Sequence, residues 1–107
     1  MARALITMPK TARKGEIIDI RALIAHPMET GYRPGADGRI LPRNIIVHFS
    51  CRYGDIEVFS ADLYPAIAAN PYIAFHTVAT ESAVLSFRWE GDNGFDQTER
   101  MELTVNG

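Results

Sequence analysis

Apolar and polar residues alternate along most of this chain with a period of two, which is typical of β-strands. In residues 45–53, Val47 and Phe49 share one face, whereas His48 and Ser50 share the other. The same alternation is found in residues 16–26, 82–89 and 99–105. We predict that these segments are antiparallel strands whose apolar faces form a common core.

One hairpin is predicted residue by residue. Gly54 and Asp55 suit a two-residue turn, because glycine accepts the positive φ that the first position of a type II′ turn requires. The resulting register pairs Tyr53 with Ile56, Arg52 with Glu57, and Cys51 with Val58. Apolar side chains then meet on one face, and opposite charges meet on the other. A second turn is predicted at residues 91–94, between the last two strands.

Residues 60–71 carry the helical signals of the chain. Ser60 or Asp62 suits the start of a short helix, and Asn70 followed by Pro71 suits its end. We predict one short helical crossing here. About seven strands with such a crossing indicate an all-β, immunoglobulin-like antiparallel β-sandwich, with a small barrel as the alternative. Residues 1–107 are predicted to form a single domain.

Composition narrows the class of protein. The chain has 107 residues, of which 47% are hydrophobic and 22% are charged, and its net charge is -2. These values are typical of a soluble globular protein and argue against nucleic acid as a partner. We see neither an apolar run of about 20 residues that would span a membrane nor a signal peptide in residues 1–8. Composition by itself therefore indicates the cytoplasm.

Cys51 is the first candidate for chemistry, because it is the one cysteine of the chain. The alternation places it on the core face beside Val47 and Phe49. A thiol in apolar surroundings has a raised pKa and is unreactive. We interpret Cys51 as a core residue, and an enzyme that uses it as a nucleophile is a disfavoured alternative.

A copper site is the second candidate. His26, Met28, His48, Cys51 and His76 are ligand types that β-sandwich copper proteins use. The spacing is unfavourable, because the next histidine after Cys51 is His76 and because His48 lies on the opposite strand face from Cys51. A small copper-binding β-sandwich protein that uses His26, Met28 and His48 stays as the alternative function. We predict no metal and no cofactor.

Residues 26–43, HPMETGYRPGADGRILPR, have no regular pattern. A loop of this length is uncommon in a compact domain and is usually functional or disordered. Pro27, Pro34 and Pro42 restrict its backbone. Tyr32 and three arginines have the composition of interface centres. These residues leave two interpretations open, a rigid protein-binding loop and a solvated loop without a partner.

Several apolar residues have the alternation of the solvent-facing set. Apolar side chains on the outer face of a sheet indicate that part of the sheet is covered, and a partner chain would cover it. A shifted alternation at the strand ends is the alternative interpretation. These residues are Ile17, Leu23, Ile46, Phe59 and Val84.

Longer segments resemble a known family. HPMETGYR at 26–33, NPYIAF at 70–75 and FRWEGDNG at 87–94 are similar to the Z subunit of the SoxYZ sulfur-carrier complex. The likeness extends through nearly the whole chain and includes residues 9–28 and 59–71. The segment at 26–33 is its most specific part.

The resemblance implies an immunoglobulin-like sandwich that pairs with a Y subunit as a heterodimer in thiosulfate oxidation. In this family the Y subunit carries the sulfur chain on a cysteine near its C-terminus, and the Z subunit is not an enzyme. This chain ends in ELTVNG without a cysteine, so it looks like Z. The family works in the periplasm, and Z is exported with the signal-bearing Y subunit, which replaces the cytoplasmic expectation.

The predicted partner-binding residues follow the family motif. The family motif maps onto His26, Pro27, Met28, Thr30, Gly31 and Arg33, and we add Tyr32 to form the predicted partner-binding set. Cys51 has no role that the resemblance implies. Other Sox enzymes are expected as transient partners, and the isolated chain is expected to form a homo-oligomer through its exposed apolar face.

Overall fold

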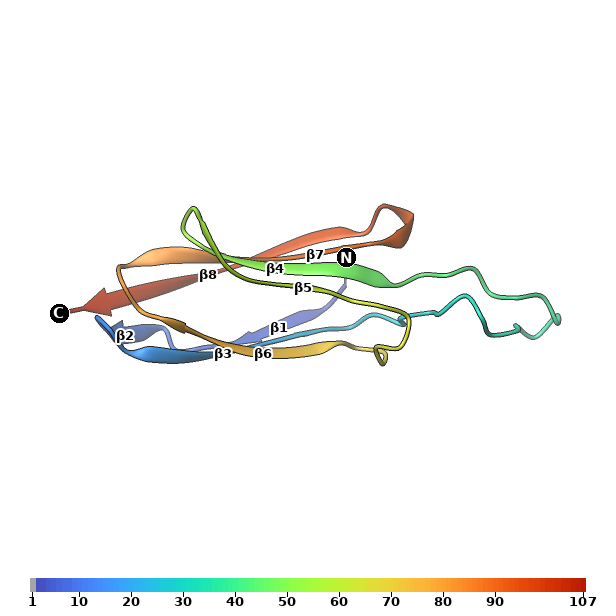
Figure 1. Ribbon diagram of the computed structural model, residues 1–107, viewed down its shortest axis with the longest axis horizontal. Coiled ribbons are helices and arrows are strands. Elements are labelled where there is room, and N and C mark those ends of the chain that lie inside the picture. Colours follow the sequence, from blue (N-terminus) through green and yellow to red (C-terminus); the bar gives the residue numbers. More distant parts are fainter. Residues whose placement is uncertain (1) are drawn as a thin grey trace.

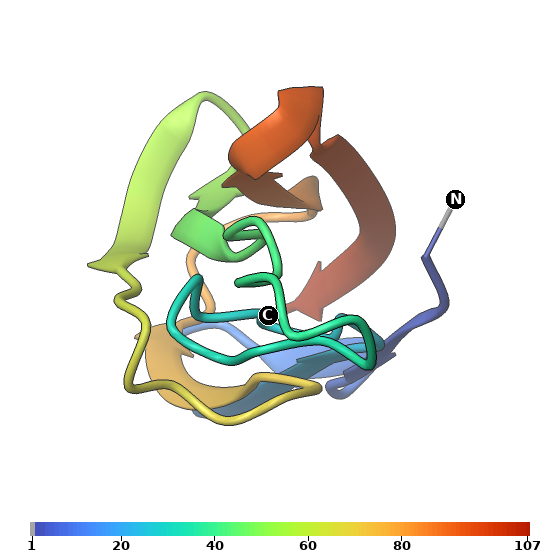
Figure 2. The ribbon, with the colours of Figure 1, turned by 90° about the vertical axis from the view of Figure 1, so that its right-hand side faces the viewer.

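The computed structural model describes residues 2–107, in which two β-sheets pack face to face (Figures 1 and 2). The strands of the described chain are β1 (Ala4–Thr7), β2 (Thr11–Arg13), β3 (Ile17–Ile24), β4 (Ile46–Tyr53), β5 (Ile56–Asp62), β6 (Tyr72–Val78), β7 (Ala83–Gly91) and β8 (Asp96–Asn106). One short 3-10 turn, η1 (Asp92–Gly94), links β7 to β8. Within residues 2–107, no helix has the length and apolar character needed to cross a lipid bilayer.

The two sheets have different sizes. The smaller has the strand order β1-β3-β6, and the larger has the order β2-β8-β7-β4-β5. Strand β2 pairs with β8 in parallel, and the other pairs are antiparallel. The predicted all-β sandwich is therefore confirmed. It has eight strands, close to the predicted number of about seven, and two of them, β1 and β2, are short.

Phe49 of β4 lies at the centre of the core. Its ring packs against Phe75 of β6, in the opposite sheet, and against Phe87 and Trp89 of β7, with centroid distances of 6.2, 6.5 and 5.3 Å. Phe49, Phe87 and Trp89 are fully buried. Burial of each such side chain contributes about 1.5–3 kcal/mol, so this cluster holds the two sheets together.

The β4–β5 hairpin confirms most of the predicted register. Gly54 has a φ of 60°, and the structure pairs Tyr53 with Ile56 and Arg52 with Glu57. The third predicted pair is wrong, because a β-bulge shifts the ladder and sets Cys51 opposite Phe59 instead of Val58. The predicted turn at residues 91–94 is confirmed by η1.

The predicted helical crossing at residues 60–71 is wrong. Strand β5 continues to Asp62, since Ser60, Ala61 and Asp62 pair with β4, and the following residues form turns. Ladder hydrogen bonds to a neighbouring strand outweigh the weak helical signals, because nucleation of a short helix is unfavourable.

The exposed apolar residues follow the prediction in part. Ile17, Leu23 and Val84 are exposed, as alternation predicts. Ile46 is fully buried, which corrects the prediction, because a register shift between Ile46 and His48 turns both Ile45 and Ile46 inward. Phe59 is half-buried and stacks on Phe75 at 4.4 Å.

Candidate functional site

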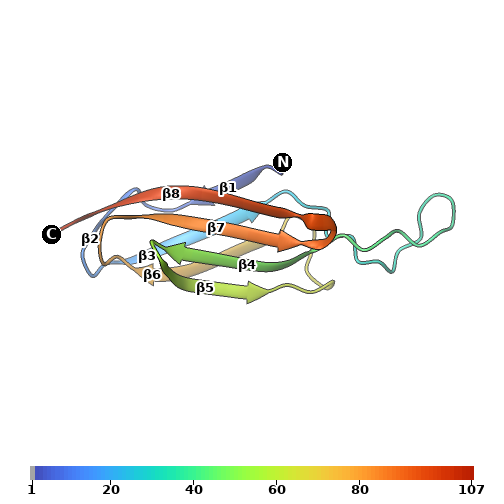
Figure 3. The same cartoon turned by 90° about the horizontal axis from the view of Figure 1, so that it is seen from above.

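Residues 26–44, which we call the arm, join β3 to β4 as a long irregular hairpin. The arm projects beyond one end of the sandwich (Figures 1 and 3). At its base, the N–H and C=O groups of Glu29 and Asn44 exchange two hydrogen bonds of 2.8 Å. Farther out, the Leu41 N–H donates to the Arg33 carbonyl at 2.8 Å, and Pro34 forms a β-bridge with Ile40. These cross-links make the arm a defined structure.

A chain of buried polar contacts fixes the arm to the sandwich. His26 Nδ1 accepts a hydrogen bond of 3.0 Å from the Met28 N–H. The Met28 Sδ accepts one of 3.2 Å from the Ile46 N–H. Met28 is buried and has a φ of 50°, a left-handed conformation that costs about 1–2 kcal/mol for a residue with a Cβ. The contacts with His26 and Ile46 hold it in this conformation.

His26 is buried between the arm and the turn after β7. Its ring packs against the ring of Phe95 at a centroid distance of 5.1 Å, with an angle of 74° between the two planes. The backbone N–H of His26 donates to Asn70 Oδ1 at 3.0 Å, and the backbone carbonyl of His26 accepts from the Asn70 N–H at 2.8 Å. Burial lowers the pKa of His26 below the usual 6.5, although the nearby Asp92 carboxylate opposes the shift. A neutral ring that accepts at Nδ1 carries its proton on Nε2.

Arg43 and Asp92 hold the returning half of the arm. Arg43 Nε and Nη2 donate to Asp92 Oδ2 and Oδ1, both at 2.8 Å. Asp92 Oδ2 also accepts the Ile45 N–H at 3.1 Å. The Arg43 hydrogen bond and then the Ile45 N–H lower the pKa of Asp92. The arm is therefore attached to η1 as well as to the strands that it connects.

The middle of the arm presents Tyr32 to solvent. Thr30 Oγ1 accepts the Tyr32 N–H at 3.2 Å, and Gly31 has a φ of 88°. A Cβ at Gly31 would lie 3.0 Å from the Arg43 Cβ, so the two halves of the arm approach closely at this glycine. The turn leaves the Tyr32 side chain 79% exposed.

The charges of the arm are mutually neutralised. Arg33 Nη2 pairs with Glu29 Oε1 at 2.7 Å, and this hydrogen bond lowers the pKa of Glu29. Arg39 lies 3.9 Å from Asp37. With these charges paired, the outward surface offers Tyr32 and Ile40, the latter 58% exposed. Exposed aromatic and aliphatic side chains next to paired arginine suit protein binding.

The structure divides the predicted partner-binding residues into two groups. His26 and Met28 are buried, so their side chains position the arm. Pro27, Tyr32 and Arg33 are exposed, and Thr30 and Gly31 are half-buried. Binding by this set stays a prediction.

Two further residues of the site escaped the sequence analysis. Asp92 lies within FRWEGDNG, one of the segments that carry the resemblance, but its pairing with Arg43 spans 49 positions. No local pattern reveals a contact of that range. Ile40 lies in a segment without a regular pattern. An apolar residue directly after three charged or turn-forming residues was the signal in the sequence that could have indicated an exposed contact residue.

The candidate copper ligands lie apart. His48 Nδ1 contacts Asp62 Oδ1 at 2.8 Å, and His76 Nε2 lies 3.4 Å from Asp19 Oδ1 on the other sheet. His26 lies at the arm base, where its side chain contacts the Met28 N–H. Among residues 2–107, no group of three or more histidine, cysteine or acidic side chains is arranged to hold a metal ion.

Cys51 lies in the core, as predicted. Its side chain is fully buried, and burial raises the pKa of the thiol to about 12. The thiolate is the nucleophilic form of cysteine, so the folded protein offers almost none of it at neutral pH.

The family model described as "Sulphur oxidation protein SoxZ" matches residues 6–102, nearly the whole chain. The chain belongs to the SoxZ family. It is thus a Sox-system subunit of sulfur oxidation. No curated protein matches the sequence.

Solved structures show the same fold at low identity. A superoxide reductase (neelaredoxin) from Ignicoccus hospitalis is 15% identical, with a TM-score of 0.73 over 98% of this chain and 82% of that chain. A putative superoxide reductase from Thermotoga maritima is 14% identical, with a TM-score of 0.75 over 97% and 86%. The sulfur carrier protein SoxY from Chlorobium limicola f thiosulfatophilum is 15% identical, with a TM-score of 0.69 over 97% and 79%. These likenesses concern the fold alone.

The lowered pKa of His26 predicts a pH-dependent stability. The unfolded protein binds a proton at this ring near pH 6.5, whereas the folded protein resists it. The stabilising effect is therefore complete above about pH 6.5 and is lost as the pH falls toward the folded pKa. Urea unfolding at about pH 7.5 and 5.5 should show this loss, and His26→Gln should reduce it. His76→Gln is the control and should keep the loss; an unchanged loss in His26→Gln contradicts the assignment.

Burial of Cys51 predicts slow alkylation. At about pH 8, only a very small fraction of a thiol with a pKa of about 12 is ionised, and burial keeps the alkylating reagent away from it. Ser60→Cys supplies a matched exposed thiol on the neighbouring strand β5. Mass spectrometry after brief treatment with iodoacetamide should show one fast-reacting group in that variant and none in the parent protein. Equal rates for the two cysteines would refute the core assignment.

Proposed function

We propose that this chain is the non-catalytic subunit of a sulfur-carrier heterodimer and that it binds a SoxY-type partner through the arm. Membership of the SoxZ family supports the pathway. The observation that carries the binding proposal is the projecting arm itself, which is fixed at its base and exposes Tyr32 and Ile40.

Rigidity of the arm favours tight binding. A flexible loop loses conformational entropy when a partner orders it, and this loss weakens association. Here the Glu29–Asn44 hydrogen bonds, the His26–Met28 contact and the Arg43–Asp92 pair order the arm beforehand. The surface is thus preorganised for one partner shape.

Arg33 and Tyr32 are the proposed contact centre. A partner that covers Arg33 also covers its carboxylate Glu29, so the buried charge stays paired. Tyr32 adds a large side chain with a hydroxyl that can hydrogen-bond at the rim. Tyrosine and arginine are the residue types in which binding energy concentrates.

The proposed role needs no cofactor in this chain. As the resemblance implies, the SoxY-type partner carries the sulfur chain on its own cysteine, and this chain shapes the surface beside that cysteine for the other Sox enzymes. The buried Cys51 supports this division, because its thiol is inaccessible to a sulfur donor.

Binding to the partner is tested by co-expression followed by gel filtration and titration calorimetry. Tyr32→Ala and Arg33→Ala should each raise the Kd by about 5- to 100-fold while the isolated fold is unchanged. Ile56→Ala is the control, since Ile56 is 69% exposed at the β4–β5 turn, at the opposite end of the sandwich from the arm (Figure 1). Independent elution of the two proteins rejects the heterodimer, and wild-type affinity in both arm variants rejects the arm as its surface.

We further propose that this chain acts in the periplasm after export with its signal-bearing partner, as the resemblance implies. Cell fractionation checks this proposal. The chain should enter the periplasmic fraction when the partner carries its signal, and it should stay in the cytoplasm when that signal is deleted. Periplasmic recovery without any partner would contradict co-export.

A further inference from the structure

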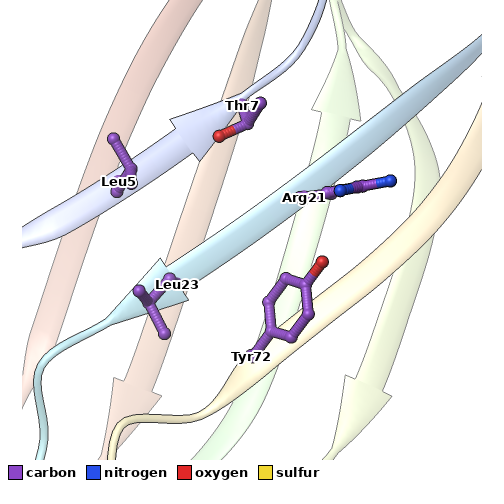
Figure 4. Close-up of a pocket in the computed structure, with 5 residues that line it drawn as sticks. All are labelled: Leu5, Thr7, Arg21, Leu23 and Tyr72. Atoms are coloured by element: carbon purple, nitrogen blue, oxygen red, sulfur yellow. The ribbon is translucent and has the colours of Figure 1, made fainter.

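The outer face of the three-stranded sheet β1-β3-β6 carries an apolar row at the arm end. Leu5, Leu23 and Tyr72 lie directly opposite one another on the three strands, and all are exposed. Figure 4 shows these side chains around a shallow pocket that Thr7 and Arg21 also line. Three adjacent apolar side chains on a solvent-facing sheet indicate an interaction surface.

The same face continues as a charged band and ends in a second apolar row. Arg21 Nη2 pairs with Asp19 Oδ2 at 3.1 Å in the middle of β3, beside His76 of β6. At the far end, Ile17 lies opposite Val78, and both are exposed. The face is therefore apolar at each end and charged in the middle.

The outer face of the larger sheet differs. On this face, Glu102 lies opposite the exposed Val84 of β7, Arg100 lies opposite the next outward residue, and Arg88 follows farther along β7. An apolar partner surface would have to strip water from these charges. The outer face of the three-stranded sheet is thus the better candidate for contact with another protein molecule.

We propose that the three-stranded face binds the same face of a second copy of this chain, in an antiparallel arrangement. The twofold axis lies in the plane of the interface between the two copies. It runs perpendicular to the strands at the level of Ile20. Because strand positions are inverted about Ile20, Leu23 meets Ile17 of the second copy and Tyr72 meets Val78 of the second copy. The apolar row at the arm end of one copy then covers the apolar row at the far end of the other copy.

The charged band selects this arrangement. Inversion about Ile20 brings Arg21 opposite Asp19 of the second copy, and the twofold axis repeats the contact, so two opposite-charge contacts form. A twofold axis parallel to the strands would instead set Arg21 against Arg21 and Asp19 against Asp19. Like charges in direct opposition are destabilising, so charge complementarity favours the antiparallel pair.

The dimer leaves the arms free. In the antiparallel arrangement the two arms point in opposite directions, because each continues from the arm end of its own sandwich (Figure 3). The inference therefore goes beyond the proposed function and does not compete with it. A face of three strands, about 10–15 Å wide and about 25 Å long, is small for an interface. We expect association at tens of micromolar rather than at nanomolar concentration.

Exchanging the charges of residues 19 and 21 tests the antiparallel register. Dimerisation of the isolated chain is measured by analytical ultracentrifugation from about 5 to 500 µM. Asp19→Arg and Arg21→Asp should each weaken dimerisation at least about tenfold, because each puts like charges in opposition. The double variant Asp19→Arg/Arg21→Asp restores both contacts across the axis and should return to within about threefold of the parent affinity. Failure of the double variant to recover overturns the antiparallel register.

A matched pair of apolar residues tests the face. Leu23 is 38% exposed on the central strand of the smaller sheet, and Val84 is 40% exposed on the central strand of the larger one. Leu23→Asp should abolish the dimer, and Val84→Asp should leave it intact, with circular dichroism confirming that both variants fold. A chain that stays monomeric throughout, or a dimer that only Val84→Asp disrupts, overturns the proposal. Because the isolated chain is measured, loss of SoxY binding would leave these results unchanged.

Discussion

Packing around Phe49 is the constraint on which the rest of the structure depends. From β4, its ring reaches Phe59 of β5, Phe75 of β6 and Trp89 of β7, so one side chain joins both sheets. With β3 and β4 held in opposite sheets, the segment between them must leave the sandwich at one end. The position of the arm is thus a consequence of the core.

The arm keeps its shape because its polar groups are satisfied where it leaves the core. Among residues 2–107, no buried side-chain nitrogen or oxygen lacks a hydrogen-bond partner. His26, Met28 and Asp92 each supply an acceptor to a backbone N–H that the irregular turn would otherwise leave unpaired. An unpaired buried N–H costs about 1–3 kcal/mol, which explains why a segment without regular structure is nevertheless ordered.

The fold is shared by proteins of different function. The Chlorobium SoxY and the superoxide reductases have TM-scores of 0.69 to 0.75 against this chain, at 14–15% identity. Function therefore resides in what is built on the sandwich. In this chain the proposed contact surfaces are the arm, with its neutralised arginines, and the banded outer face of the smaller sheet. They lie on different parts of the molecule, so one chain has room for two protein contacts.

Alternation by itself determined the positions of β3, β4, β7 and β8 and the burial of Cys51, because the side-chain period of a strand follows from backbone geometry. Turn-forming residues determined the two hairpin turns. The absence of a regular pattern located the arm segment, and the resemblance implied a partner for it. Only the tertiary structure decided where bulges turn Ile46 inward and set Cys51 opposite Phe59. It also decided that β5 extends through Asp62 and that Arg43 pairs with Asp92. Such outcomes depend on residues far apart in the chain, and a local pattern carries no information about a neighbour that only folding brings near.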